Sequence, residues 1–562
     1  TVTIGDSGDT INIVGTLQNN GAAIPGDISS VVAGTGLSGG GTSGDVTLNV
    51  EAAQSGVTSL GTLTALTVNG NVSIDGGTVK LDGNYPTGSN NVALGNGALD
   101  DGSLSGAGNT AIGTNSLTAN TSGTFNVAVG QNSLNANTTG QQNTAIGRVA
   151  LQTNIAGICN TAIGHNALTT NICCFNTAVG NEALRLNTTG QNNVAVGVNA
   201  LDANTTADNN TAMGSFALST NTEGFSNTAV GHCAIFTNTT GDKNTGVGVG
   251  ALLASTTADN NTAVGYLSLA ANTTGTNNSA FGKDALLANT TASQNVAIGS
   301  LSSVTTTTGC KNTAVGHASF YNNSTGDNNT ALGNFALNDN TTADDNTAVG
   351  YFALKANTTG ANNTAVGRCA LANNTDSRQN TGIGNIALFD NTEGEFNTAV
   401  GSQSLADNTT ADCNVAVGYT SLRKNTTGAN NTAVGTFSLA CNTTGAGNVA
   451  VGALALEDNT IGCQNTSVGY TSLRNNTEGN FNAAFGRDSM NVNTTGDNNT
   501  AIGTCALVYN QTADNNTAVG FKSLFANTTG TQNTAIGYCS LGANTTGAHN
   551  IAVGKDSLAT NT

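Results

Sequence analysis

The residues of this chain that could do chemistry recur at fixed distances along it. Carboxylates are the clearest case, because eight aspartates stand at multiples of 17 residues from one another. Pairs that are one interval apart, such as Asp242 with Asp259 and Asp327 with Asp344, would repel each other unless a hard cation such as Ca²⁺ lay between them. The Ca²⁺-binding nonapeptide is absent, so a solvated loop is the favoured interpretation. The eight residues are Asp208, Asp242, Asp259, Asp327, Asp344, Asp412, Asp497 and Asp514.

No catalytic group emerges from the other reactive residues. The four histidines (His165, His232, His317 and His549) are scattered, and none has a carboxylate or cysteine at a useful spacing. Residues 34–41 are rich in glycine, but no lysine follows them, so they do not form a phosphate-binding loop. A polysaccharide-cleaving β-helix enzyme would need clustered carboxylates in a groove. We therefore expect no enzyme, no catalytic residues, no cofactor and no metal site.

The eleven cysteines do not form a disulfide framework in the sequence. With ~4.8 Å between successive repeats, Cys505 and Cys539 would lie roughly 10 Å apart, beyond disulfide reach. Only Cys159 with Cys173 or Cys174 has a spacing that permits a pair. The remaining cysteines are interpreted as small, buried or half-buried residues.

These spacings come from an internal repeat of 17 residues that opens with an asparagine. The repeat reads Asn-x-Ala-Val-Gly-x-x-Ala-Leu-x-x-Asn-Thr-Thr-Gly-x-x, and its positions are called phases 1 to 17 below. From Asn176 to Asn550 the interval never changes. A unit this short cannot bury a core alone, so it must stack on its neighbours. Residues 89–562 are therefore predicted to form a rod of 28 coils.

Each half of the repeat is too short for a helix and is bounded by Gly or Asn, which favours β structure. We expect two strands per coil, at phases 2–4 and 7–10. The invariant Gly of phase 5 would form one corner, because Gly adopts a positive φ without cost. Asn-Thr-Thr-Gly at phases 12–15 would form the other. In-register stacking then predicts an all-β fold, a parallel β-solenoid of the β-roll type.

Side-chain size suggests how the coils assemble. Phases 4 and 9 carry large apolar residues and are expected to fill the coil. Phases 3 and 8 carry Ala or Ser and are expected to face outward, since neighbouring residues of a strand point to opposite faces. A solvent-facing position need not be small in every copy, so another backbone would have to come close. We therefore expect identical chains to pack laterally, three around an axis; a monomeric solenoid is the alternative.

The asparagines of phases 1 and 12 have a structural and a functional interpretation. Stacked asparagines form amide ladders along a β stack and satisfy backbone groups at turns. Asn-Thr-Thr also matches the N-glycosylation acceptor, for example at Asn137, Asn187 and Asn272. A motif that recurs as an obligate turn needs no sugar to explain it, so the ladder is favoured.

The first 88 residues have a different texture. Residues 1–54 contain short alternating runs at 1–4, 10–14 and 46–50, with the Gly-rich segment 34–41 between them. Residues 55–88 contain strand-like runs joined by tight-turn residues. We predict an N-terminal β attachment or assembly region at 1–54, a short β-strand module at 55–88 and the repeat shaft at 89–562.

Composition excludes several classes of partner. The net charge of -18 reflects 15 Lys and Arg against 33 Asp and Glu, and no basic stripe that would bind nucleic acid is present. No apolar stretch approaches the ~20 residues of a membrane span, and no signal peptide is visible. The chain starts at Thr1 and stops within a copy at Thr562, so we expect both ends to be cut.

The repeat resembles a known family. Asn-Thr-Ala-Val-Gly, followed by a small residue and Leu, resembles the Asn-Ser-Val-Ala-Ile-Gly repeats in the heads of trimeric autotransporter adhesins. The resemblance covers 89–562, although the repeat here is longer. It implies a left-handed β-roll and a trimer.

The N-terminal part resembles a different group. Residues 32–48, with the sequence Val-Ala-Gly-Thr-Gly-Leu-Ser-Gly-Gly-Gly-Thr-Ser-Gly-Asp-Val-Thr-Leu, and residues 81–88 resemble segments of bacteriophage tail fibres and related virion structural proteins. Such fibres are usually trimers and often carry a receptor-binding tip.

These observations predict a homotrimeric fibre shaft on the surface of a phage or virus, where it holds a host-binding tip away from the particle. Its partners would be identical chains, virion structural proteins at the N-terminus and a host receptor. The alternative is a bacterial extracellular adhesin or surface filament. Stacking at ~4.8 Å per coil gives a rod on the order of 130 Å long.

Overall fold

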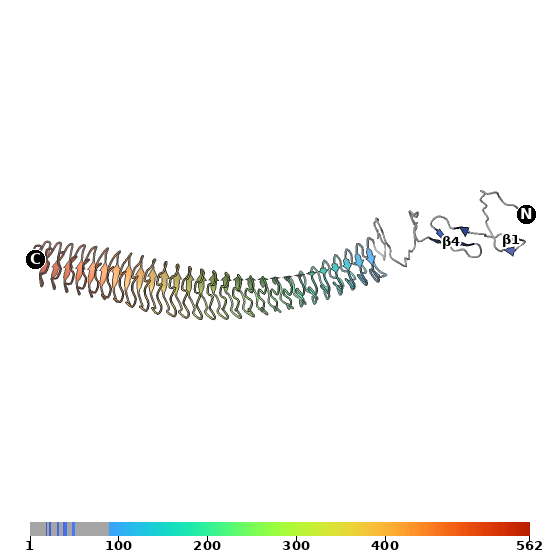
Figure 1. The fold of residues 1–562 in the computed structure, drawn as a ribbon, viewed down its shortest axis with the longest axis horizontal. Coiled ribbons are helices and arrows are strands. Elements are labelled where there is room, and N and C mark those ends of the chain that lie inside the picture. The colour runs from blue at the N-terminus through green and yellow to red at the C-terminus, as the bar shows by residue number, and fades with distance from the viewer. Residues whose placement is uncertain (1–17, 20–21, 24–30, 33–36, 42–47, 51–88) are drawn as a thin grey trace, which may run out of the picture. The chain divides into compact units, whose positions relative to one another are not determined.

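A computed structural model describes residues 18–19, 22–23, 31–32, 37–41, 48–50 and 89–562 (Figure 1). The chain divides into two compact units, Thr1–Lys80 and Leu81–Thr562. The predicted β-strand module at 55–88 lies outside the described residues.

The first unit contains short antiparallel strands. β1 (Gln18–Asn19) pairs with β2 (Ala22–Ala23), and β4 (Leu37–Gly41) pairs with both β3 (Val31–Val32) and β5 (Leu48–Val50). The strand expected at 46–50 is confirmed over Leu48–Val50. The Gly-rich segment, expected only to separate strands, itself supplies β4. The runs at 1–4 and 10–14 lie outside the described residues.

The second unit is the predicted solenoid. Each of the 28 copies contributes one three-residue strand at phases 2–4, and each strand pairs in parallel with the strand of the next copy. Register is kept throughout, so that Ala162 lies beside Ala178 and Ala178 beside Ala195. The strands are β6 (Val92–Leu94), β7 (Thr110–Ile112), β8 (Val127–Val129), β9 (Thr144–Ile146), β10 (Thr161–Ile163), β11 (Thr177–Val179), β12 (Val194–Val196), β13 (Thr211–Met213), β14 (Thr228–Val230), β15 (Thr245–Val247), β16 (Thr262–Val264), β17 (Ser279–Phe281), β18 (Val296–Ile298), β19 (Thr313–Val315), β20 (Thr330–Leu332), β21 (Thr347–Val349), β22 (Thr364–Val366), β23 (Thr381–Ile383), β24 (Thr398–Val400), β25 (Val415–Val417), β26 (Thr432–Val434), β27 (Val449–Val451), β28 (Thr466–Val468), β29 (Ala483–Phe485), β30 (Thr500–Ile502), β31 (Thr517–Val519), β32 (Thr534–Ile536) and β33 (Ile551–Val553).

The prediction of a second strand in each coil, at phases 7–10, is wrong. This segment is a run of turns in which phases 7 and 9 adopt the left-handed conformation, as in Asn199 (φ 53°) and Leu201 (φ 53°). A residue with that φ cannot continue a strand. The turn reverses the chain within a few residues and still directs the phase 9 Leu into the coil.

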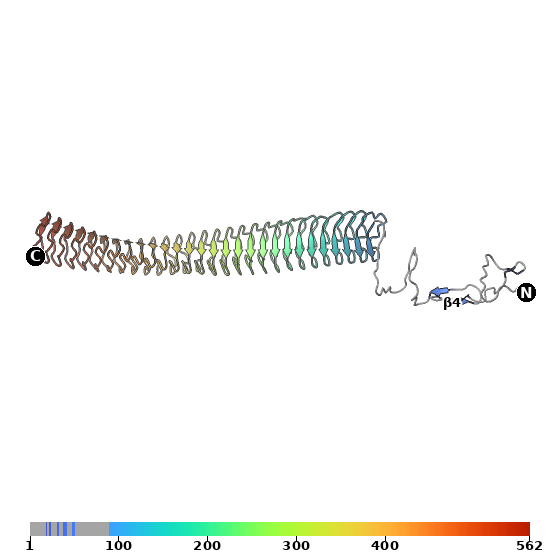
Figure 2. The ribbon, with the colours of Figure 1, turned by 90° about the horizontal axis from the view of Figure 1, so that it is seen from above.

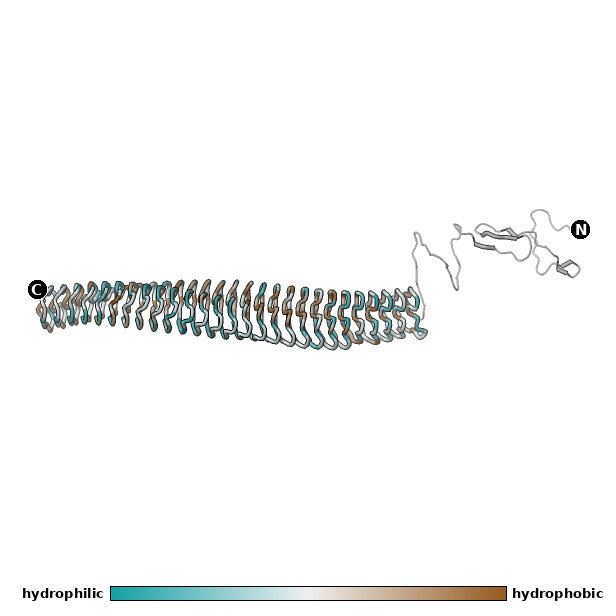
Figure 3. The backbone as a smooth tube through the Cα atoms, turned by 60° about the horizontal axis from the view of Figure 1, so that its bottom comes forward, coloured by the Kyte–Doolittle hydropathy of each residue, from teal (hydrophilic) through white to brown (hydrophobic). Residues whose placement is uncertain are grey.

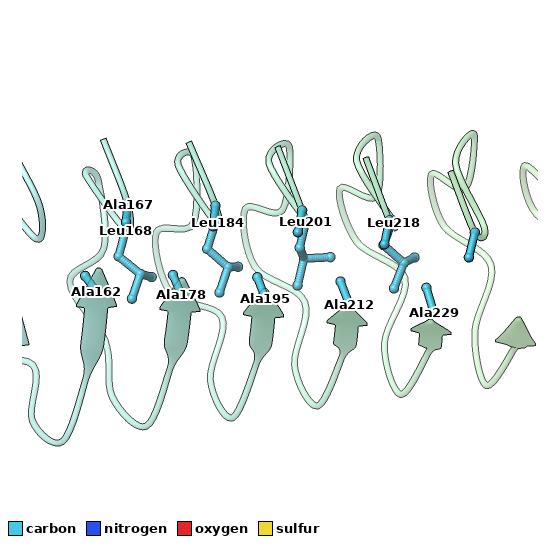
Figure 4. Close-up of a cluster of buried hydrophobic side chains, with 14 of the residues drawn as sticks. Ala162, Ala167, Leu168, Ala178, Leu184, Ala195, Leu201, Ala212, Leu218 and Ala229 are labelled. Atoms are coloured by element: carbon cyan, nitrogen blue, oxygen red, sulfur yellow. The ribbon is translucent and has the colours of Figure 1, made fainter. Parts of the chain in front are cut away.

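The directions in which the strand side chains point are also the reverse of the prediction. Ala at phase 3 points inward and is fully buried, whereas the large apolar residue of phase 4 faces outward, as Leu332 does with 44% of its surface exposed. Phases 8 and 9 are both buried. Figure 4 shows the reason: Leu184 and Leu201 extend from the turn toward Ala178 and Ala195 on the strands. The coil is so thin that strand and turn leave room for one Leu and small residues only.

Backbone hydrogen bonds between coils extend well beyond the strands. In the turn, the N–H of Leu201 donates to the carbonyl of Ala217 in the next coil (2.9 Å), and the N–H of Asn199 donates to Asn181 in the preceding one (3.0 Å). At phase 13, the hydroxyl of Thr188 donates to the carbonyl of Thr205 (2.9 Å). Nearly the whole coil is therefore held in register, and the second unit is a gently curved rod along which the strands gradually turn (Figures 1 and 2).

The apolar core of the rod is interrupted once. One cluster of buried apolar residues runs from Ala98 to Ala297 and a second from Ala314 to Ala552. Between them Ser303 occupies phase 9 in place of Leu. The fully buried Phe320, at phase 9 of the next coil, belongs to the second cluster, so the apolar contact along the axis is broken at Ser303.

The corner at phase 5 needs Gly, as predicted. Gly333 has φ +139°, and a Cβ there would lie 2.5 Å from the carbonyl oxygen of Gly350 in the next coil. The same positive φ recurs at phase 5 in every described coil. Gly102, by contrast, has open space around its Cβ position.

We predict that Gly333→Ala destabilises its region by roughly 2–4 kcal/mol, because the added methyl group meets backbone and φ is strained. Long repeat arrays do not unfold in a single step, so local opening is the quantity to measure. Hydrogen exchange should accelerate in the coils around residue 333. Gly102→Ala is the matched control and should leave exchange near residue 102 unchanged; equal effects of the two substitutions would contradict the packing described.

Candidate functional site

The rod presents three surfaces, each built from fixed phases. The strand face carries the outward side chains of phases 2 and 4. The turn face carries phases 6, 7, 10 and 11, and the loop face carries phases 13, 14, 16 and 17. Because every coil repeats the same path, each phase forms a line of side chains along the axis, and hydropathy accordingly forms bands along the rod (Figure 3).

The strand face is uncharged over its full length, with an apolar line at phase 4 beside a line at phase 2 that is mostly Thr. Phase 4 is Val, Ile, Leu, Met or Phe in all 28 strands, and phase 2 is Thr, Val, Ser, Ala or Ile. The larger phase 4 side chains are substantially exposed, for example Met213 at 45% and Ile298 at 42%. No Asp, Glu, Lys or Arg occurs at either phase in these strands. A solvated face normally mixes charges among its apolar residues, so the absence of charge sets this surface apart from an ordinary solvent-facing sheet.

Two amide ladders run inside the rod, which confirms the structural interpretation of the asparagines. At phase 12, Asn357 Nδ2 donates to Asn340 Oδ1 (3.0 Å) and Asn340 Nδ2 donates to Asn323 Oδ1 (3.0 Å). At phase 1, Asn329 Oδ1 accepts the backbone N–H of Asn346 (3.0 Å). These side chains are almost fully buried, so each coil provides hydrogen-bond partners for buried polar groups of its neighbour.

Interruptions of the phase 12 ladder show that it needs an asparagine in every coil. The buried Oδ1 atoms of Asn154, Asn238 and Asn289 have no hydrogen-bond partner. Asn238 and Asn289 precede coils in which phase 12 is Ser255 and Thr306, which supply no amide donor. Asn154 precedes the single 16-residue copy, where Asn171 Nδ2 donates to Cys173 instead. Each orphaned oxygen therefore marks an irregular coil.

The same contacts bear on N-glycosylation. Asn187 is fully buried, and its Nδ2 donates to Asn171 Oδ1 (2.7 Å) and to the carbonyl of Gly190 (3.0 Å). Asn137 makes the equivalent pair of hydrogen bonds, and Asn272 is likewise buried. The nitrogen that would carry a sugar is thus enclosed in the folded coil.

We predict that Asn340→Asp destabilises the surrounding coils by roughly 2–4 kcal/mol at neutral pH, because it buries a carboxylate and removes the donor to Asn323. Burial raises the pKa of the new carboxyl above its unfolded value of about 3.9. The loss of stability should therefore be small in acid, where the carboxyl is protonated in both states. It should grow as pH rises from the unfolded pKa to the raised pKa of the folded state.

Hydrogen exchange across residues 323–357 as a function of pH measures the Asn340→Asp effect. Asn334→Asp is the control, since Asn334 is exposed and uses only its oxygen, which accepts the N–H of His317 (3.1 Å). If Asn340→Asp lowered protection from exchange equally at every pH, or if Asn334→Asp lowered it as much, loss of the ladder would not be the cause of the destabilisation.

The phase 16 aspartates have a structural role that the sequence did not reveal. Asp327 Oδ1 accepts the backbone N–H of Cys310 in the preceding coil (2.6 Å), and Asp344 Oδ1 accepts that of Asp327 (2.7 Å). The pair Asp242 and Asp259 is joined in the same way (2.8 Å). The backbone N–H between each two carboxylates offsets their repulsion. Among the described residues no group of three or more His, Cys, Asp and Glu is placed to hold a metal ion.

Neutral side chains make the same contact in other copies, so the contact needs an acceptor atom rather than a negative charge. Asn480 Oδ1 accepts the N–H of Cys463 (2.8 Å), and Ser293 Oγ accepts that of Thr276 (3.0 Å). The shared property of these side chains, a short acceptor, is the signal by which the sequence could have shown the role.

We predict that Asp327→Ala opens the loop of the preceding coil, at a cost of roughly 1–3 kcal/mol for the lost charged hydrogen bond. Exchange of the Cys310 amide should accelerate. Asp327→Asn keeps an acceptor oxygen and should stay close to wild type. If Asp327→Asn accelerated exchange as much as Asp327→Ala, the negative charge at phase 16 would matter rather than the acceptor oxygen of the side chain.

The histidines and cysteines do not converge on a reactive centre. His165 lies 2.9 Å from Arg148 Nη1, and His317 packs edge-on against Phe335. One contact was missed in the sequence: Cys233 Sγ lies 3.7 Å from His232 Nε2. Burial raises the pKa of the Cys233 thiol, which favours the unreactive protonated form.

All eleven cysteines are free. The pairing considered for Cys159 is not made: its Sγ donates to Gln142 Oε1 (3.1 Å), and Cys174 Sγ accepts the N–H of Ile158 (3.3 Å). Burial also raises the pKa of Cys173. These cysteines thus serve as small polar contacts between coils.

The fold places this chain among the parallel β-solenoid repeat proteins. Comparison of the chain with protein-family models, with curated proteins and with solved structures gave no match. In the part of the chain that the structure describes, no helix is long and apolar enough to span a membrane.

Proposed function

We propose that residues 89–562 form the shaft of a homotrimeric fibre, in which the strand faces of three chains meet around a common axis. The observation that carries this proposal is the uncharged strand face, with a large apolar side chain at phase 4 of every coil. The small residues of phases 3 and 8 do not form this interface, because they are buried within the rod's own core.

The extent of the strand face supports a stable assembly. All 28 phase 4 side chains are at least partly exposed, and they form one continuous apolar line along the chain. A monomer in water would leave this line uncovered, whereas soluble monomers rarely expose contiguous apolar patches larger than roughly a few hundred Å².

The shape of the strand face favours copies of this chain as its occupant. Its residues are repeated at the spacing of the coils, and a second copy has the same spacing and the same turn of the strand face along its length. Identical parallel rods therefore match one another over many coils, whereas a globular partner would cover only a few. Three copies agree with the resemblance to trimeric adhesin heads and tail fibres.

For the biological role, we propose a phage or virus tail or host-attachment fibre on the virion surface, attached to other virion proteins through its N-terminal region. A stiff rod with hydrogen bonds along its axis suits the task of holding a binding tip at a distance. The alternative is a bacterial extracellular adhesin or surface filament, in which the side of the rod itself binds. Gold-labelled antibodies against the repeat array distinguish these roles: label on virions supports the first, and label on bacterial cells alone contradicts it.

We predict a mass of three times the chain mass of 55.6 kDa in sedimentation equilibrium. Leu332→Lys with Ile383→Lys places charges on the strand face at positions that a single chain leaves about two-fifths exposed. Three copies would bring these charges together at the axis, so the double variant should dissociate or assemble far more weakly.

The matched control for the strand-face variant is Thr342→Lys with Thr359→Lys, which adds the same charges on the loop face at exposed phase 14 positions. It should remain trimeric. A wild-type monomer or dimer would contradict the trimer, and dissociation of the control but not of the strand-face variant would contradict the choice of face.

A further inference from the structure

The turn face contains a hollow of about 340 Å³ near the C-terminal end of the described rod. Three successive coils line it. Cys505 and Val508 belong to the middle coil together with Tyr509, while Asp488 and Asn491 come from the coil before and Phe525 from the coil after. The hollow is thus built entirely from phases 7, 10 and 11 of one chain.

The residues at these phases explain why the hollow forms here. Elsewhere phase 7 is often bulky, as in Phe335 and Phe352, but here it is Cys505. Beside it, Tyr509 and Phe525 form a raised edge in which their rings meet edge-to-face, with centroids 5.1 Å apart. A small residue next to two large ones leaves a depression rather than a filled groove.

The polar wall of the hollow is held in place with acceptors still available. Asp488 accepts hydrogen bonds from the Thr471 hydroxyl and from Arg487 Nε (2.9 Å). Asn491 Nδ2 donates to the carbonyl of Thr471 (2.9 Å), and its Oδ1 accepts no hydrogen bond within the described residues. Each carboxylate oxygen can accept more than one hydrogen bond.

In the aromatic wall, Tyr509 is exposed and carries a hydroxyl donor, while Phe525 is half-buried. Tyr509 is 45% exposed, and its hydroxyl has no partner among the described residues. Lys522 Nζ lies 5.1 Å from the centre of the Phe525 ring, so its charge is directed onto the aromatic ring. With Arg487 held by Asp488, the charges around the hollow are paired or directed onto a ring.

We propose that this hollow binds a neutral saccharide unit of a surface glycan. A sugar ring has an apolar C–H face, which packs on the exposed ring of Tyr509 beside the half-buried Phe525. It also has a rim of hydroxyl donors, which fit the acceptors of Asp488 and Asn491. An anionic ligand fits less well, because both of these groups present oxygen.

The turn face lies across the coil from the strand face, so a trimer joined through its strand faces leaves three such hollows open to solvent. Weak individual binding, typical of shallow sites, would then add up through multivalency on a glycan-covered surface. The saccharide site itself does not rest on the proposed trimer, since one chain supplies every residue that lines it.

Saturation-transfer NMR on the full chain tests the proposal, with the methyl glycosides of glucose, galactose, mannose and N-acetylglucosamine as probes at millimolar concentration. Sialic acid serves as the anionic probe. We expect transfer to the ring C–H protons of at least one neutral glycoside. Tyr509→Ala should weaken its binding by about tenfold. Tyr266→Ala, which removes an equally exposed tyrosine outside the hollow, should leave binding unchanged.

A second variant guards against a folding artefact. Cys505→Phe fills the hollow with a residue that phase 7 carries in other coils, so the coil should fold normally while binding is lost. Absence of transfer to every neutral probe overturns the proposal. Binding of sialic acid alone, or binding that survives both Tyr509→Ala and Cys505→Phe, also overturns it. A monomeric protein that still binds the glycoside would contradict the trimer and leave the saccharide site intact.

Discussion

The structure depends on hydrogen bonding between successive coils along the rod axis. A 17-residue coil has almost no interior, because Ala at phases 3 and 8, Leu at phase 9 and the two asparagines fill it. It gains stability only from the coils above and below. Backbone hydrogen bonds in the strand and the turn make most of that contact. The asparagine ladders supply hydrogen-bond partners for polar groups that the backbone leaves unpaired. Even one irregular coil leaves a buried oxygen without a donor, as at Asn154.

This dependence also explains where the sequence may vary. Phases that point into the coil or toward the next backbone are nearly fixed, whereas phases 6, 7, 10, 11, 16 and 17 change from copy to copy. The coil from Asn295 to Lys311 departs from the pattern twice, with Ser303 at phase 9 and Thr306 at phase 12. The apolar core is interrupted there, and the preceding Asn289 loses its ladder partner. We therefore expect this coil to open more readily than regular coils in the middle of the rod.

Much of the fold could be predicted from the sequence, because period and turn chemistry are local. The invariant Gly of phase 5 and the asparagines of phases 1 and 12 indicated corners and ladders, and both are present. The faces of the strand could not be predicted from residue size. Leu332 was assigned to the interior because it is large, yet Ala331 occupies it, since the width of the coil is set by the turn opposite. That turn was itself missed, because nothing in a single Leu at phase 9 signals a left-handed conformation.

The candidate sites followed the same division. Asp327 and its equivalents drew attention as carboxylates, but their role is that of a short acceptor for a neighbouring N–H. The hollow beside Tyr509 could not be seen in the sequence, because it arises from the relative sizes of residues that three successive coils bring together. The structure thus separates two surfaces: a uniform, uncharged strand face, and a turn face whose residues vary from coil to coil.

Electron cryomicroscopy of the isolated rods, viewed in cross-section, tests the proposed assembly most directly. It should show three coils around one axis, with the strands innermost and the phase 4 side chains in contact at the centre. A single coil in cross-section, or several coils joined through their turn faces with the strands exposed to solvent, would contradict it.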